Sequence, residues 1–257
     1  MLKIENVEIA GWEAAIRGMR NPKNSWDRSD SDYRPILCSK CDECETMNTK
    51  TWDDCKECDV EKLVNNAPKG FMVGPNDMNL MLNLAKGGPV HAKYRRMIVV
   101  WLDITAPLYW WKEFDTYKVG TVANSCSTMH KIHDKEFTVK DFSCEHMRPL
   151  AFKHLLSTIK VLNEYRDMYL NGGRDDNLDG TSFRVFEPKD KDAWWQMIQL
   201  LPSSYNQKRT IKLNYEVLHH IYHDRRNHKL DEWHVVCDWI ESLPYSEIIT
   251  QKVVGIE

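Results

Sequence analysis

The sequence lacks any long hydrophobic run. Its longest apolar stretch is Met97–Ile104, far shorter than the roughly 20 residues that a membrane-spanning helix needs. The first residues also lack a basic segment followed by an apolar one, which is the pattern of a secretory signal. We therefore expect a cytoplasmic protein with no membrane partner.

An excess of charge of one sign is lacking too, because 35 lysines and arginines stand against 38 aspartates and glutamates, for a net charge of −3. Proteins that bind nucleic acid through its phosphates carry an excess of positive charge. Nucleic acid is therefore not an expected partner. Large aromatic residues are plentiful instead, with 10 Trp, 10 Tyr and 7 Phe in 257 residues. We expect some of them to line a groove or a contact between subunits.

Three familiar motifs are missing: Gly-x-Gly-x-x-Gly, the phosphate-binding P-loop and the Gly-x-Ser-x-Gly nucleophile turn. Their absence disfavours a Rossmann-type dinucleotide site. Cys126 could serve as a nucleophile, and His130 or His133 as an acid or base, but the sequence names no partner for any of them. The catalytic residues therefore stay unidentified.

Cysteines concentrate in residues 34–74, which hold five of the eight. Their spacing contains Cys-x2-Cys pairs separated by a short loop, which is the arrangement that tetrahedral zinc needs. We predict a small Cys-rich insert that a structural zinc ion orders. The sequence leaves open which four cysteines bind the metal, and an iron–sulfur cluster or reduced surface thiols are alternatives. The candidate ligands are Cys38, Cys41, Cys44, Cys55 and Cys58.

The spacing of apolar residues predicts many helices and few strands. Asn76 or Asp77 is expected to cap the second helix, and residues 120–128 and 171–190 are expected to be polar loops. Together these elements predict a single α+β domain over residues 1–257. The predicted strands are Leu2–Ile9 and Met97–Thr105, and the predicted helices are Trp12–Arg20, 76–86, 107–118, 145–170, Ala193–Leu201, Leu213–Arg226 and Lys229–Ser242.

Three polar segments are candidates for ligand binding. The loop after the aromatic helix offers hydroxyl, thiol and amide groups to a phosphate or a heterocycle, although such residues also cap helices. Lys208 and Arg209 lie among small polar residues and suit an anion, or else belong to a solvated connector. Arg225 ends a predicted helix, where a cation suits the helix dipole or could face a phosphate. His219 and His223 share a helix face, but no third metal ligand is evident. The loop residues are Thr121, Asn124, Ser125, Cys126 and Ser127.

The order of these segments resembles the flavin-dependent thymidylate synthases over residues 75–245. His91 stands at the family's first motif histidine, and Met97–Thr105 matches its strand. Residues 116–129 occupy the place of the Arg-His-Arg-x-x-Ser-x-Asn-Glu-x-Ser-x-Arg-Tyr motif. Only the third of its first three residues, Lys118, keeps a cation, and Cys126 replaces its second serine. The later family features fall on Leu201-Pro202, Lys208 or Arg209, Asn214, Arg225 and Asp231-Glu232-Trp233.

The resemblance implies an α+β fold with a twisted sheet flanked by helices, and a homotetramer with sites between subunits. It implies reductive methylation of dUMP or a related pyrimidine nucleotide, with FAD, a folate and NADPH. Because two motif arginines are absent, a protein that binds or sequesters the nucleotide without turnover is the alternative. The implied cofactor-binding residues are His91, Lys118 and Asn214. The implied substrate-binding residues are Thr121, Asn124, Ser125, Cys126, Ser127, Lys208, Arg209 and Arg225.

Overall fold

The structure is a computed structural model that describes residues 2–35, 69–176 and 182–251. The chain divides into two compact units. Unit 1 comprises Met1–Ile9 and Val99–Thr250, and unit 2 comprises Ala10–Ile98 and Gln251–Glu257. The single domain over residues 1–257 stays a prediction.

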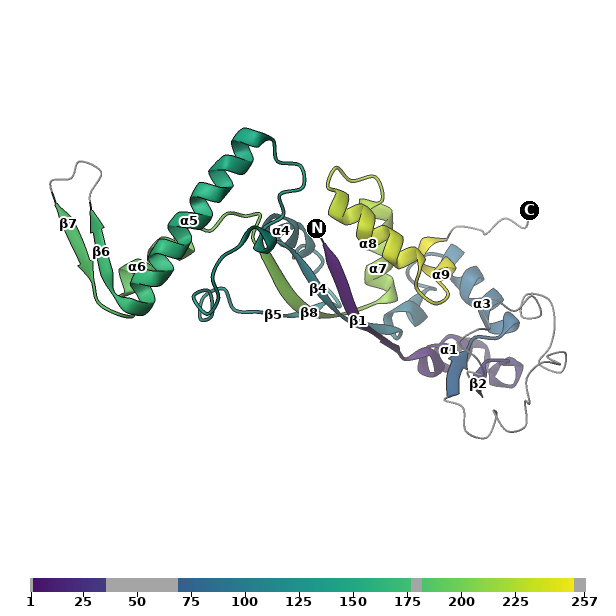
Figure 1. The fold of residues 1–257 in the computed structure, drawn as a ribbon. Coiled ribbons are helices and arrows are strands. Elements are labelled where there is room, and N and C mark those ends of the chain that lie inside the picture. The colour runs from purple at the N-terminus through teal and green to yellow at the C-terminus, as the bar shows by residue number, and fades with distance from the viewer. Residues whose placement is uncertain (1, 36–68, 177–181, 252–257) are drawn as a thin grey trace, which may run out of the picture. The chain divides into compact units, whose positions relative to one another are not determined.

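Unit 1 is built on a four-stranded sheet with the strand order β1-β4-β8-β5 (Figure 1). The two central strands pair antiparallel, with Val99 opposite Asn214 at one end and Pro107 opposite Asn206 at the other. Strand β5 also pairs antiparallel with β8 and forms one edge of the sheet. The strands are β1 (Lys3–Ala10), β4 (Val99–Pro107), β5 (Val122–Ser125) and β8 (Asn206–Asn214).

Side chains of the central strands alternate between a buried face and a more exposed face, as the two-residue period of a strand requires. Leu102 and Ile211 are buried on one face, whereas Trp101 and Thr210 are exposed on the other. The segment around Lys208 and Arg209, for which an anion site and a solvated connector were alternatives, forms strand β8. Ion pairs and hydrogen bonds accommodate its polar side chains on both faces.

An aromatic cluster joins helix α4 to helix α8 in unit 1. Trp110 lies with its ring centroid 4.9 Å from that of Trp111 and 4.8 Å from that of Trp233, and all three side chains are buried. Asn214 caps α7, because its side-chain oxygen accepts from the backbone N–H groups of Glu216 and Val217. The helices are α4 (Leu108–Phe114), α7 (Tyr215–Arg225), α8 (Asp231–Glu241) and α9 (Glu247–Thr250).

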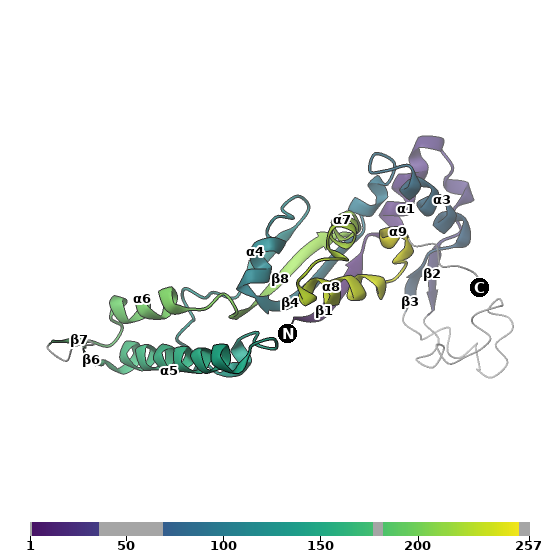
Figure 2. The same ribbon diagram turned by 90° about the horizontal axis from the view of Figure 1, so that it is seen from above.

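A second core of unit 1 lies between α5 (Pro149–Asn171) and α6 (Lys191–Leu200), which run side by side (Figure 2). A short 3-10 helix, η7 (Val139–Asp141), precedes α5. The prediction of a polar loop over residues 171–190 was wrong in part, since β6 (Gly173–Asp176) and β7 (Phe183–Phe186) form an antiparallel hairpin there. Phe186 is the one buried side chain of these two strands, and Arg174 and Arg184 lie over the rings of Phe183 and Phe186. The core side chains include Phe137, Phe142, Leu155, Ile159, Leu162 and Met197.

Unit 2 is held by the buried carboxylate of Asp77. Its oxygens accept from Arg20 Nε at 2.6 Å, from Ser29 Oγ at 2.7 Å and from Ser31 Oγ at 2.6 Å. The expected cap at Asn76 or Asp77 was wrong, because the helix begins at Pro75 after Gly74. The elements are α1 (Trp12–Arg20), η1 (Asn21–Lys23), η2 (Trp26–Arg28), β2 (Asp32–Pro35), β3 (Lys69–Met72), α3 (Pro75–Lys86) and η6 (Lys93–Arg96). In the described ranges of both units, no helix is long and apolar enough to cross a membrane.

Candidate functional site

Two arginines are each stacked on an aromatic ring and paired with an acidic residue at the end of α4. The first is Arg209 on β8, whose guanidinium carbon lies 4.2 Å from the centroid of the Trp111 ring. Its Nη1 donates to Asp115 Oδ1 at 2.8 Å and its Nε donates to Gln207 Oε1 at 3.0 Å. Only 14% of the Arg209 side chain is exposed. The guanidinium group of Arg209 is therefore held in one orientation.

The second is Arg225 at the end of α7. Its guanidinium carbon lies 4.9 Å from the Trp233 ring centroid and 5.6 Å from that of Tyr117. Nε donates to the Tyr117 hydroxyl at 2.9 Å, and Nη1 donates to Glu113 Oε2 at 3.1 Å. Burial raises the pKa of Tyr117, so its hydroxyl stays protonated at neutral pH. It donates in turn to Asp224 Oδ2 at 3.3 Å.

Glu113 gathers donors from three segments onto one oxygen. Besides Arg225, its Oε2 accepts from Trp233 Nε1 at 3.0 Å and lies 3.3 Å from His228 Nε2. The other ring nitrogen of His228 accepts from the backbone N–H of Leu230 at 3.1 Å. In the neutral ring this contact places the proton on Nε2, where it faces Glu113. Glu113 therefore ties the end of α4 to α7, to the following turn and to α8.

Both guanidinium groups retain donors for a ligand. The bonds above engage Nε and Nη1, and neither Nη2 has a hydrogen-bond partner in the part of the chain that the structure describes. An arginine that is stacked and fixed along one edge presents its remaining N–H groups in a fixed geometry, which suits phosphate or carboxylate oxygens. The arrangement can bind an anion at each of Arg209 and Arg225.

Strand β5 carries the candidate hydroxyl and amide residues, and the register separates them onto two faces. Ser125 lies opposite Arg209 and shares its face, whereas Asn124 lies opposite Thr210 on the other face. The backbone N–H of Cys126 donates to Lys208 O at 2.9 Å. By the alternation of antiparallel bonds, the N–H and C=O of Ser125 then point away from β8. All four side chains of β5 are exposed.

Three more of the loop residues have defined surroundings. The Thr121 hydroxyl is buried, and no partner for it exists among the residues that the structure describes. Ser127 Oγ accepts from the backbone N–H of His130 at 2.9 Å. The Cys126 carbonyl accepts from Gln207 Nε2 at 2.9 Å, which fixes the amide that in turn holds Arg209.

Lys208 lies on the opposite face of the sheet from Arg209. Its Nζ is 3.0 Å from Asp103 Oδ2. Asp103 also accepts from the Thr210 hydroxyl at 2.6 Å and from Asn6 Nδ2 at 2.9 Å. Hydrogen bonds from Thr210, Asn6 and Lys208 lower the pKa of Asp103 to about 2. Lys208 is therefore committed to a separate polar network.

Two of the three expected cofactor residues lie in unit 1, and one lies in unit 2. Lys118 is exposed after the end of α4, Asn214 is engaged in capping α7, and His91 is an exposed residue of unit 2. The expected metal ligands Cys38, Cys41, Cys44, Cys55 and Cys58 lie outside the described residues. Within the described ranges, no group of three or more His, Cys, Asp or Glu residues could hold a metal ion. His219 instead uses Nδ1 in a 2.7 Å contact with Ile249 O.

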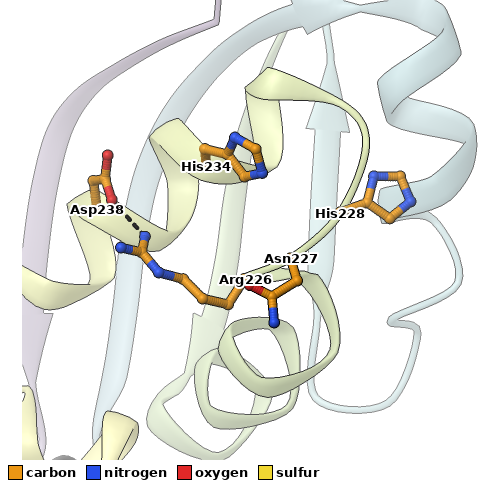
Figure 3. Close-up of a pocket in the computed structure, with 5 residues that line it drawn as sticks. All are labelled: Arg226, Asn227, His228, His234 and Asp238. Carbon is orange, nitrogen blue, oxygen red and sulfur yellow. Dashed lines mark hydrogen bonds and ion pairs between the residues drawn. The ribbon is translucent and has the colours of Figure 1, made fainter.

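A polar cavity of about 580 Å³ lies at the turn between α7 and α8, next to the residues that surround Glu113 (Figure 3). Arg226 reaches Asp238 of α8, while His228 lies in the turn and links the cavity to Glu113. Neighbouring Arg225 and Arg226 therefore have different partners. The residues that line the cavity are Arg226, Asn227, His228, His234 and Asp238.

Sequence reasoning found both arginines but missed Glu113, Asp115, Tyr117 and His228. One signal was available: two acidic residues stand at the end of α4, where the helix dipole disfavours negative charge. Acidic residues at this position indicate that a cation from another segment lies close to them.

The fold of the chain is similar to that of solved flavin-dependent thymidylate synthases and of a related methylase. No family model and no curated protein matches the sequence. The flavin-dependent thymidylate synthase ThyX from Helicobacter pylori, solved with FAD and dUMP, superposes with a TM-score of 0.57 at 10% identity, covering 97% of this chain and 98% of that one. The UMP/dUMP methylase PolB from Streptomyces cacaoi, bound with 5-Br dUMP, gives a TM-score of 0.53 at 12% identity, covering 98% and 94%. These similarities establish the fold.

Proposed function

We propose that this chain binds a pyrimidine nucleotide and holds its phosphate with Arg209 and Arg225. The observation that carries the proposal is that both guanidinium groups are fixed on aromatic rings, while Nη2 of each has no hydrogen-bond partner among the described residues. Solved structures of the same fold contain dUMP or 5-Br dUMP, which supports a pyrimidine nucleotide as the ligand.

Strand β5 is the proposed contact for the rest of the nucleotide. Ser125 is the cross-strand neighbour of Arg209, and its outward N–H and C=O offer one donor and one acceptor side by side. A uracil ring presents the complementary pair of a carbonyl oxygen and an N–H group. The buried Thr121 hydroxyl, which has no partner among residues 2–35, 69–176 and 182–251, is a further proposed contact.

Methylation of dUMP or UMP is the reaction proposed from the fold, with a folate as carbon donor and FAD and NADPH supplying the reducing power. Support for flavin is weaker than for nucleotide, because two arginines of the family motif are absent from residues 116–129 and Asn214 uses its side-chain oxygen to cap α7. Zinc binding and a homotetramer stay predictions.

A nucleotide-binding protein without turnover is the second candidate. The two stacked arginines favour it, together with the absence of two of the family motif's arginines from residues 116–129. Absorbance spectra after incubation with FAD and removal of the excess separate the two candidates. Retained flavin together with conversion of dUMP to dTMP would support the enzyme, and dUMP binding without either would support the binding protein.

Calorimetric titration with dUMP tests the proposed function directly. Arg225→Ala removes charge-assisted hydrogen bonds of about 1.5–3 kcal/mol, so affinity should fall roughly ten- to hundredfold. Arg226→Ala is the matched control, because it removes the adjacent arginine, which is paired with Asp238 instead. It should change affinity less than about twofold. Absence of dUMP binding by the wild type, or equal affinity in Arg225→Ala, would contradict the proposal.

A further inference from the structure

We propose that Asp115 is an internal substitute for the ligand phosphate and sets the affinity of the site. Its carboxylate occupies Arg209 while the site is free, and a phosphate must replace it there. The inference rests on the proposed function and adds a specificity-determining residue to it.

The two acidic residues of this site differ in how firmly they are held. Glu113 is fixed by Arg225, Trp233 and His228 on one oxygen. The carboxylate of Asp115 accepts one hydrogen bond within the described residues, from Arg209 Nη1, and 51% of the side chain is exposed. Asp115 is therefore the carboxylate that can leave its arginine by a side-chain rotation.

The position of Asp115 also gives no local reason for a negative charge. It is the C-cap of α4, and its backbone N–H bonds to the carbonyls of Trp111 and Glu113. The negative end of the helix dipole lies here, so a carboxylate is disfavoured. Its compensating interaction is the ion pair with Arg209.

Arg209 would stay in place when Asp115 moves. Its Nε is held by Gln207, whose amide is itself fixed by the Cys126 carbonyl at 2.9 Å, and its plane rests on Trp111. Departure of Asp115 then frees Nη1 beside the available Nη2. These two nitrogens form the pair that binds two phosphate oxygens side by side.

The exchange favours ligands with a phosphate monoester. Such a group carries about two negative charges at neutral pH, whereas Asp115 carries one. A nucleoside without phosphate offers nothing to replace the carboxylate. Asp115 thereby makes binding depend on the phosphate and lowers the affinity for every anionic ligand.

The test is calorimetry of Asp115→Asn with dUMP, deoxyuridine and inorganic phosphate. Affinity for dUMP and phosphate should rise three- to tenfold, and affinity for deoxyuridine should not change. Asp176→Asn is the matched control, since it frees Arg174 from an exposed pair in the same unit and should leave dUMP affinity unchanged. In an Arg209→Gln background, Asp115→Asn should bring no gain. Asp115→Ser serves as a second variant if the amide lowers the melting temperature.

The outcomes separate this inference from the proposed function. Unchanged or weaker dUMP binding by Asp115→Asn, with normal binding by the wild type, would overturn the role of Asp115 alone. A wild type that binds no dUMP would contradict the proposed function. In that case, tighter binding of inorganic phosphate by Asp115→Asn would still support the inference, and equal phosphate binding would overturn it.

Discussion

Replacing Glu113 with alanine should lower both the stability of unit 1 and its affinity for nucleotide. The change removes the acceptor of Arg225 Nη1 and Trp233 Nε1, and the carboxylate that lies 3.3 Å from His228 Nε2. The Trp233 side chain is fully buried, and a buried donor without an acceptor costs about 1–3 kcal/mol. Arg225 and His228 retain partial access to water and add less. We expect the free energy of unfolding to fall by about 2–3 kcal/mol.

Denaturant titrations of Glu113→Ala, Glu113→Gln and a control measure this effect. Glutamine keeps an oxygen where the three donors meet, so it should recover stability to within about 1 kcal/mol of the wild type. Glu164→Ala removes an exposed carboxylate that lies 3.7 Å from Lys160 and should cost less than about 0.5 kcal/mol. Equal losses for Glu113→Ala and Glu164→Ala would refute the role of Glu113 as the common acceptor. Calorimetry should also show dUMP affinity falling about fivefold, because one bond of Arg225 is lost.

Two further predictions concern other parts of the molecule. Thr210→Val removes the strongest of the hydrogen bonds that lower the pKa of Asp103 to about 2, so carboxyl NMR titration should show this pKa rise. Since the folded pKa is depressed, the contribution of Asp103 to stability is complete above pH 4 or so and is lost as pH falls toward 2. A pKa of Asp103 that stays at about 2 in Thr210→Val would contradict the role of the Thr210 hydrogen bond. Gly11→Ala would place a Cβ 2.1 Å from the Met97 carbonyl oxygen, at a backbone φ of 99°. Thermal unfolding should therefore show that the free energy of unfolding falls by more than about 2 kcal/mol. An unchanged melting temperature would contradict this crowding.

Sequence patterns predicted the elements whose apolar residues are periodic. The helix over Trp12–Arg20 was placed correctly, and the central strand expected at Met97–Thr105 lies at Val99–Pro107. Strands β5 and β8 were missed, because their polar residues are accommodated by cross-strand partners rather than by an apolar pattern. Pairing of this kind depends on segments that are distant in the sequence.

The candidate site was predicted only in part, because its residues too are paired with segments that are distant in the sequence. Arg209 and Arg225 were identifiable as cations in polar or helix-terminal surroundings. Their acidic partners stand 94 and 112 residues away, so no local pattern connects them. The adjacent cations Lys208 and Arg209 were grouped together, although a strand directs successive side chains to opposite faces.

That alternation along β8 has a consequence for how such a chain can diverge. One residue inserted at the start of the strand would slide Lys208 over the Trp111 ring and turn Arg209 toward Asp103, and every later side chain would exchange faces as well. Substitutions can alter the chemistry at each position while the positions themselves persist. Chains of this fold should therefore vary in residue type along the strand far more readily than in the number of residues between Pro202 and Asn214.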